Sequence, residues 1–272
     1  MADSRAIGVF DSGLGGLTVV RELIRRNPCE DIVYFGDTGR VPYGTRSRET
    51  IKKYAAEDER FLLKHNVKLI IAACGTVSSV AADTAISLPV PFFEMVTHAA
   101  RAAVNATRNR KIGVIGTAAT VLSGSHKKEI LKLLPEAEVT AASCPLFVPL
   151  VESGWYGEED IVVLETVRRY LSPIISAGCD TLILGCTHYP VLEEAIRRVT
   201  EGNIALINPG VAVSEAVSVF IKSNALENSN NGMGIHNFYV SDKPDSFMAQ
   251  ASVLLGEELD DSRVEQVDLS TL

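Results

Sequence analysis

Two cysteines occupy matching positions in this 272-residue chain, 112 residues apart. Cys74 and Cys186 each follow an apolar run typical of a buried strand, and each precedes a small polar residue and a helical pattern. The N-terminus of a helix favours a thiolate over a thiol. Two thiols flanking one carbon could remove a proton from one face and return it to the other, which is racemisation without a cofactor.

A structural role is the alternative for both positions, because a free cysteine also packs as a small hydrophobic residue. Cys29, Cys144 and Cys179 lie away from strand-to-helix turns, and we interpret them as structural. The five cysteines are odd in number and have no Cys-x-x-Cys spacing, which argues against a disulfide framework or a zinc site. The sequence therefore predicts free thiols and no metal.

Two further residues could assist the second cysteine. His188 could tune Cys186 or shuttle its proton, because its ordinary pKa is near 6.5. Cys186 and His188 could also bind a metal, although no second pair of ligands is visible. Glu152 is an acid where an apolar run passes into a turn, and a solvated loop acid is the alternative.

The glycine-rich turn at residues 11–16 is a candidate anion site, because free backbone N–H groups at a helix start can hold a carboxylate or phosphate. Asp37 lies about where a ribose-binding acid would stand, but a dinucleotide fingerprint needs glycine where Thr18 is found. Asp11 would also repel a pyrophosphate. We interpret Asp11 as an acid or base helper beside a thiol, with an N-cap role as the alternative.

The elements that must position these residues alternate along the chain between short β-like apolar runs and amphipathic stretches. The predicted strands are 6–11, 31–36, 68–73, 91–96, 111–116, 138–142, 181–185, 205–207 and 237–241. The predicted helices begin near residues 14, 45, 76, 97, 120, 158, 190, 210 and 244. This alternation predicts parallel sheets covered by helices, with ligands beyond the carboxyl ends of the strands.

An internal sequence similarity divides the chain into two parts. Residues 7–12 resemble residues 112–117, and each segment opens a stretch that later reaches one of the two cysteines. The internal similarity predicts two similar α/β halves, with chance resemblance between two strand-to-helix turns as the alternative.

The composition is that of a globular protein, with 46% hydrophobic residues, 22% charged residues and a net charge of −8. No basic patch predicts a nucleic-acid partner. We expect no signal peptide and no membrane span, and a reducing cytosol that keeps the thiols free. Residues 224–234 are predicted to form a polar surface loop, and the acidic end a solvated tail.

Taken together, the motifs resemble those of the glutamate racemases, in the aspartate/glutamate racemase family. They come in the family's order, between residue 7 and about residue 256. The segments are Asp11-Ser-Gly-Leu-Gly-Gly, Gly36-Asp-Thr, Pro42-Tyr-Gly, the Cys74 motif, Glu152-Ser-Gly-Trp and Gly185-Cys-Thr-His-Tyr-Pro. The last is specific, because related aspartate racemases typically differ at the histidine.

The resemblance implies a cofactor-independent isomerase that interconverts L- and D-glutamate for peptidoglycan in the bacterial cytoplasm. It implies two similar three-layer α/β domains with mostly parallel sheets, related by pseudo-symmetry, with the active site between them. The first domain would comprise residues 1–97 plus 208–256 and the second residues 98–207, followed by an acidic tail at 257–272. No lysine stands in a strand-end motif, so pyridoxal phosphate has no evident anchor.

The family also implies roles for individual residues. Cys74 would act on the α-proton of D-glutamate with help from Asp11. Cys186 would act on that of L-glutamate with help from His188 and Glu152. The residues expected to bind substrate are Ser12, Asp37, Pro42, Tyr43, Gly44, Gly75, Thr76 and Thr187.

Several positions depart from the family pattern. Gly75 replaces the usual Asn, and the loss of a hydrogen bond to a charged group costs about 1.5–3 kcal/mol. Residues 92–95 replace smaller ones, with Glu94 at a usual Gly, and residues 97–99 replace Glu-Pro-Gly. Asn208 stands where Asp is common. Two alternatives therefore stay open: a racemase of aspartate, hydantoin or another small acid, and an inactive small-acid sensor. The sequence leaves the oligomeric state open, with a homodimer as one option.

Overall fold

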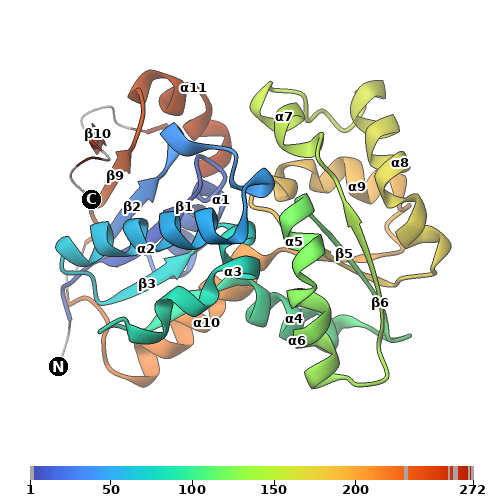
Figure 1. Cartoon of the computed structure of the whole chain (residues 1–272), viewed down its shortest axis with the longest axis horizontal. Coiled ribbons are helices and arrows are strands. Elements are labelled where there is room, and N and C mark those ends of the chain that lie inside the picture. The colour runs from blue at the N-terminus through green and yellow to red at the C-terminus, as the bar shows by residue number, and fades with distance from the viewer. Residues whose placement is uncertain (1–2, 230–231, 257, 260–262, 269, 271–272) are drawn as a thin grey trace.

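The computed structural model describes residues 3–229, 232–256, 258–259, 263–268 and 270, and the chain forms two α/β halves side by side (Figure 1). The strands of the first half are β1 (Ile7–Asp11), β2 (Ile32–Gly36), β3 (Leu69–Ala72), β4 (Phe92–Glu94), β9 (His236–Val240) and β10 (Val264–Gln266). Those of the second are β5 (Lys111–Gly116), β6 (Glu138–Ser143), β7 (Thr181–Leu184) and β8 (Ala205–Ile207). Every strand pairing among the described residues is parallel. The prediction of two α/β domains with mostly parallel sheets is confirmed.

The two sheets repeat one topology. The first has the order β10-β9-β2-β1-β3-β4 and the second the order β6-β5-β7-β8, so the run β2-β1-β3-β4 recurs in the second half. Ile7 and Ile112 lie in the equivalent strands β1 and β5. Cys74 and Cys186 follow the equivalent strands β3 and β7. The internal similarity in the sequence therefore reflects a repeated fold.

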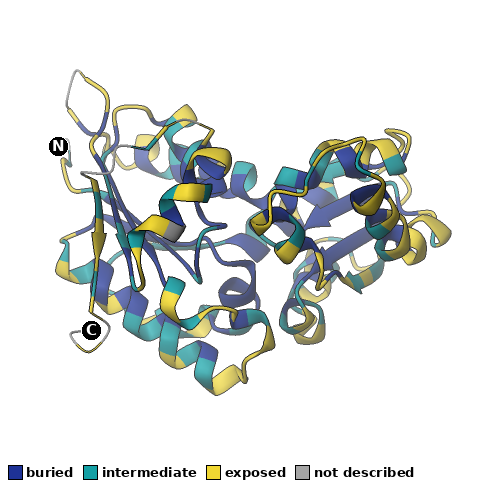
Figure 2. Ribbon diagram, turned by 90° about the horizontal axis from the view of Figure 1, so that it is seen from above, coloured by how far each residue is buried: buried dark blue, intermediate teal, exposed yellow. Residues whose placement is uncertain are grey.

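Helices cover the sheets because each carries an apolar face. They are α1 (Leu17–Arg26), α2 (Arg48–Lys64), α3 (Gly75–Val80), α4 (Met95–Ala106), α5 (Ala118–Ser123), α6 (Ser125–Leu133), α7 (Phe147–Glu152), α8 (Ile161–Ser176), α9 (Glu193–Val199), α10 (Pro209–Ser223) and α11 (Pro244–Leu255). In α1, for example, Val19, Val20 and Leu23 recur at helical spacing and are buried, while Arg25 is not. Figure 2 shows the central strands as the buried interior of each half, and the exposed residues on the outer helices and the edge strands.

The chain crosses between the halves twice. At the first crossing Glu94 caps α4 by accepting hydrogen bonds from the N–H groups of Val96 and Thr97. Helix α4 then packs on α6 and α10 and contacts β7 and β8. At the second crossing Asn208 caps α10, which packs on α1 and α4. Thr97, the residue before the domain boundary expected from the family, lies in the first turn of α4.

Two segments differ from the sequence-based predictions. The predicted strand 91–96 ends at Glu94, because its side chain starts α4. Part of the predicted solvated tail, Val264–Gln266, instead pairs with β9 as an edge strand. The remaining tail residues 257, 260–262, 269 and 271–272 lie outside the described part of the chain. Within the described residues, no helix is both long enough and apolar enough to cross a bilayer.

Candidate active site

The carboxyl ends of strands from both sheets surround one cavity of about 330 Å³. This volume is at the lower end of the range of about 300–1,000 Å³ that is usual for small-ligand sites. The lining residues are 12–14, 41–45, 74–76, 117–118, 144–145, 148–149, 152 and 186–189. All the residues predicted to form the site line this cavity except Asp11 and Asp37.

Cys74 contributes one thiol from the first half of the molecule. It follows β3 at the N-cap of the short helix α3 and is buried, and its Sγ donates a hydrogen bond to Ser12 Oγ (3.3 Å). Burial, with the negative charge of Asp11 as a second cause, raises the pKa of the Cys74 thiol to about 12. The N–H of Val77 in the helix start does favour the thiolate, as expected, but burial and Asp11 act more strongly in the opposite direction. Cys74 is held as a thiol.

Cys186 contributes the second thiol from the opposite half. Its Sγ lies 3.9 Å from Nδ1 of His188, and Nε2 of His188 lies 3.0 Å from Oε1 of Glu152. Burial works against an imidazolium, but the contacts with Cys186 and Glu152 prevail and raise the pKa of His188 to about 10. A basic imidazole is therefore held between the Cys186 thiol and the carboxylate of Glu152. Cys186 also interacts electrostatically with Cys74.

Asp11 lies behind the cavity wall and is buried. Burial raises the pKa of its carboxyl group, and the charge of His188 opposes this shift. Oδ2 accepts a hydrogen bond from the N–H of Gly13 (2.9 Å), and Oδ1 has no hydrogen-bond partner among the described groups. The N-cap of α1 is Gly16, without a side-chain cap, so the N-cap alternative for Asp11 is wrong.

The glycine-rich turn is a contact surface between the halves. A side chain on Gly15 would overlap Thr187 Oγ1 and the ring of His188, and one on Gly13 would meet Val41. The space that a phosphate would need beside Gly15 is filled by the second half of the molecule. The turn therefore gives no support to the nucleotide interpretation.

Asp37 lies behind Tyr43 and does not reach the cavity. It is fully buried, accepts hydrogen bonds from Tyr43 Oη and from Ser241 Oγ (2.7 Å), and pairs with Arg40. The expected contact between Asp37 and substrate is replaced by contacts that hold Tyr43 in the cavity wall. Pro42, Tyr43 and Gly44 do line the cavity.

Gly75 is required by a close approach of the two halves. A Cβ on Gly75 would overlap the carbonyl oxygen of Gly185, which directly precedes Cys186. Beside it, the hydroxyl groups of Thr76 and Thr117 lie 3.0 Å apart, and that of Thr120 lies 3.0 Å from Thr117. The hydroxyls of Thr76 and Thr117 are polar groups from the two halves that line the cavity. They lie beside Gly75, the position where the family usually has the side-chain amide of Asn.

The other departures from the family pattern lie outside the cavity. Glu94 and Asn208 are helix caps at the two crossings. Phe93 stacks on His98, with ring centroids 5.8 Å apart, and also packs against Phe220. None of these residues lines the cavity.

The sequence analysis missed part of the cavity wall. Cys144, interpreted as structural, lines the cavity after β6, and the O–H of Tyr189 donates to its carbonyl oxygen (2.9 Å). Helix α7 carries Val148 and Glu152 to the cavity, where the sequence predicted only a turn. The available signal was the position of Cys144 at a strand end, the same rule that selected Cys186.

The lining residues include neither lysine nor arginine, and His188 is the basic side chain among them. Among the described residues, no group of three or more His, Cys, Asp or Glu side chains is arranged to hold a metal ion.

Comparison with known proteins places the chain in a family. Residues 12–217 match the Asp/Glu/Hydantoin racemase family. A glutamate racemase of Geobacter metallireducens is 42% identical over 266 residues, 97% of each protein. Glutamate racemase of Francisella tularensis, solved in complex with D-glutamate, has a TM-score of 0.91 and 38% identity, covering 99% of this chain and 100% of that one. The enzyme of Thermus thermophilus, in complex with β-chloro-D-alanine, has a TM-score of 0.89 and 41% identity, with 100% of both chains covered. The resemblance carried by the motifs is confirmed: the chain belongs to the Asp/Glu/Hydantoin racemase family, and it is an isomerase.

Proposed function

We propose that this protein interconverts L- and D-glutamate by two-base α-proton transfer between Cys74 and Cys186. The observation that carries the proposal is that the two thiols come from equivalent strand ends of opposite halves and line one cavity. Such an arrangement suits removal of a proton from one face of Cα and its return to the other.

The unequal surroundings of the thiols support a definite resting state. Cys74 is held as a thiol by burial and by Asp11, whereas Cys186 faces the imidazole of His188. In the resting enzyme Cys74 would therefore carry the proton that it donates to Cα, and Cys186, beside His188, would remove the α-proton of L-glutamate. After turnover, the protonation states are exchanged, which is the state that accepts D-glutamate.

Substrate binding would use hydroxyl and backbone N–H groups. Ser12, Thr76 and Thr187 line the cavity beside the thiols. Oriented donors of this kind stabilise negative charge that develops on a carboxylate when Cα loses its proton, and they act most strongly in a site that excludes water. Glutamate as the substrate is supported by the relatives, which are glutamate racemases at about 40% identity over the whole chain.

The test is α-hydrogen exchange in D₂O with single cysteine variants. Each of Cys74→Ala and Cys186→Ala should lose racemisation by about 10²–10⁴-fold, the usual contribution of one positioned acid or base. The Cys186 thiol left in Cys74→Ala should exchange only the α-hydrogen of L-glutamate. The Cys74 thiol left in Cys186→Ala should exchange only that of D-glutamate. Proton NMR of the α-hydrogen and chiral chromatography measure the two effects.

Cys179→Ala is the matched control, because Cys179 is a buried free cysteine outside the cavity. It should keep the wild-type rate. Full racemisation by either active-site variant would overturn the two-base mechanism. Faster turnover of aspartate than of glutamate by the wild-type enzyme would overturn the substrate assignment and leave the mechanism standing.

We also propose that the product D-glutamate supplies peptidoglycan synthesis in the bacterial cytoplasm. The support is that the relatives at this identity are bacterial glutamate racemases. Expression of the chain in a bacterial strain that requires D-glutamate should allow growth without it, and the Cys186→Ala variant should not. Failure of an enzyme that is active in vitro to restore growth would contradict this role.

A further inference from the structure

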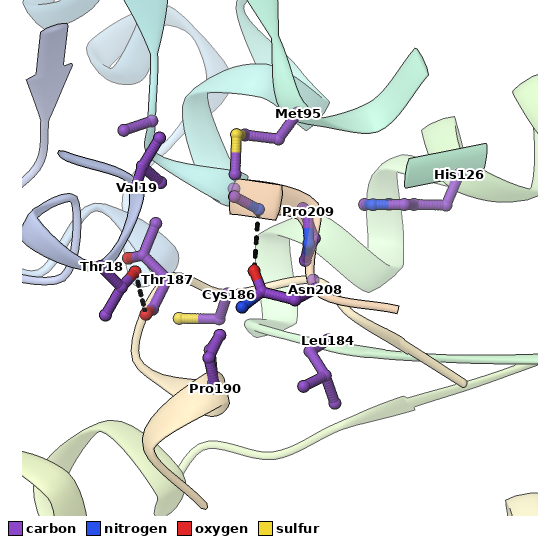
Figure 3. A pocket seen from close by; sticks show the side chains of 14 residues that line it. Thr18, Val19, Met95, His126, Leu184, Cys186, Thr187, Pro190, Asn208 and Pro209 are labelled. Carbon is purple, nitrogen blue, oxygen red and sulfur yellow. Dashed lines mark hydrogen bonds between the residues drawn. The ribbon is translucent and has the colours of Figure 1, made fainter. Parts of the chain in front are cut away.

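Helix α1 of the first half contacts the catalytic loop of the second half through one buried threonine. Thr18 Oγ1 lies 2.9 Å from the carbonyl oxygen of Thr187 (Figure 3) and 2.9 Å from that of Gly15. The Gly15 carbonyl also accepts the backbone N–H of Thr18 (3.0 Å), so the contact with Gly15 does not depend on the hydroxyl, whereas the hydrogen bond to Thr187 does. This bond joins residues 169 positions apart in the chain.

The bonded carbonyl lies between the two functional side chains of the loop. Thr187 directly follows Cys186 and directly precedes His188. The peptide plane that carries the Thr187 carbonyl also sets the direction in which the His188 ring leaves the backbone. The ring must lie 3.9 Å from Cys186 at one nitrogen and 3.0 Å from Glu152 at the other, so a small rotation of this plane would disturb both contacts.

Gly15 completes the contact from the same turn. Its missing side chain leaves the space that Thr187 Oγ1 and the His188 ring occupy. The first half of the molecule therefore provides this loop with a hydrogen-bond donor, Thr18, and with space for its side chains beside Gly15.

We propose that Thr18 is a positioning residue that holds the loop of Cys186 and His188 in its reactive geometry, with Gly15 providing the space for the imidazole ring. Thr18 does not touch the reacting atoms and acts through the Thr187 carbonyl. Its effect on racemisation rests on the proposed function, but its effect on the loop does not.

The experiment measures the alkylation of each cysteine by iodoacetamide as a function of pH, with peptide mass spectrometry to separate the sites. Thr18→Val keeps the shape of the side chain and removes the hydroxyl. The pH at which Cys186 reaches half of its limiting alkylation rate should rise by about 0.5–1 unit, the value of one neutral hydrogen bond. Thr18→Ser should restore the wild-type profile, and the profile of Cys74 should not move in either variant. The ionisable groups facing Cys186 and His188 are the same in all of these proteins: Glu152, Asp11, Cys74, Cys144 and Tyr189.

Thr200→Val is the matched control, because Thr200 is also buried and its hydroxyl donates to a backbone carbonyl, that of Ile196 (2.8 Å), away from the cavity. It should leave the Cys186 profile unchanged. If Thr18→Val does not fold, Gly15→Ala tests the same contact and should move the Cys186 profile in the same direction. An unchanged Cys186 profile in a folded Thr18→Val protein would overturn the proposal.

The kinetic arm uses the racemisation rate with glutamate. Thr18→Val should lower kcat/KM by about 3- to 10-fold, equally in both directions because the enantiomers have equal free energy, and Thr18→Ser should restore it. A shifted alkylation profile in an enzyme that racemises no glutamate would sustain the positioning role and overturn the proposed function. A loss of activity that Thr18→Ser does not restore would overturn the positioning role.

Discussion

Single glycines determine how closely the two halves of the molecule approach around the cavity. Gly75 faces the Gly185 carbonyl, Gly15 faces His188, and Gly44 faces Thr117. In each pair, a glycine of the first half lies where a side chain would overlap a residue of the second half. The glycines next to the site are thus explained by contacts between halves and not by turn conformation, because none of the three has a positive φ.

Replacement of Gly75 by Ala should test this explanation. The added Cβ would overlap the Gly185 carbonyl, so the backbone before Cys186 must move. We expect the free energy of unfolding to fall by about 1–3 kcal/mol, the usual cost of overpacking, and kcat/KM to fall with it. Urea unfolding and the racemisation assay measure these changes. Gly157→Ala should be close to neutral, because its Cβ would meet nothing nearer than 3.8 Å. Equal stability of the two variants would contradict the account.

The site residues show what the sequence could and could not predict. The sequence shows which residues lie at the ends of strands. This rule correctly predicted that Cys74 and Cys186 lie at one cavity. The direction of a side chain at a strand end does not follow, because it depends on neighbours distant in sequence. Asp37, for example, turns away from the cavity to contact Tyr43 and Ser241.

At the scale of elements, the segment between β2 and α2 forms part of the cavity wall and is fixed by one arginine. Arg40 pairs with Asp37, Glu57 and Asp58, and its guanidinium lies 4.1 Å from the centre of the Tyr54 ring. Burial raises the pKa of Asp58 well above its ordinary value. Without Arg40, buried carboxyl groups would lack a positive partner behind the loop that carries Tyr43.

Arg40→Leu should therefore lower the free energy of unfolding by about 3–5 kcal/mol, the usual result of removing one partner from a buried ion pair. The KM for glutamate should rise, because Tyr43 loses its support. Arg168→Leu provides the comparison, since Arg168 is exposed and its nearest carboxylate oxygen is 3.8 Å away. Urea denaturation of both variants should separate them clearly. A cost for Arg40→Leu no larger than that for Arg168→Leu would show that the ion pairs do not fix the loop.

The clarity of the hydrophobic and capping pattern within each element decided whether that element could be predicted from the sequence. The central strands β1, β3, β5 and β7 are rich in buried apolar residues, and each observed boundary lies within one residue of the predicted one. Helix α7 has six residues, an N-cap without a side-chain bond and a proline inside, so nothing in its sequence distinguishes it from a turn. Strand β10 is a short, largely exposed edge strand that depends on β9 for its conformation.

At the scale of the whole molecule, the two halves share an apolar core. One cluster of buried side chains includes Ile7 and Val9 of the first sheet together with Leu182 and Leu184 of the second. His126 of α6 lies beside this shared interior, in a small cavity of about 10 Å³ that also touches both crossings, at Met95 and Asn208 (Figure 3). Neither ring nitrogen of His126 has a hydrogen-bond partner among the described groups, and burial lowers its pKa to about 4.

This buried imidazole should make the whole fold sensitive to acid. Between pH 6.5 and about 4 the unfolded chain binds a proton at His126 and the folded chain does not, so stability falls as the pH falls. The loss should reach about 3 kcal/mol at pH 4, since each pKa unit is worth about 1.4 kcal/mol, and none of it is present at pH 8. Leu in the His126→Leu variant is apolar and cannot ionise. The free energy of unfolding of this variant minus that of the wild type should therefore be about 3 kcal/mol larger at pH 4 than at pH 8. Urea unfolding of both proteins across this range measures the difference, and parallel pH profiles would show that His126 is already protonated, or already solvated, in the folded state.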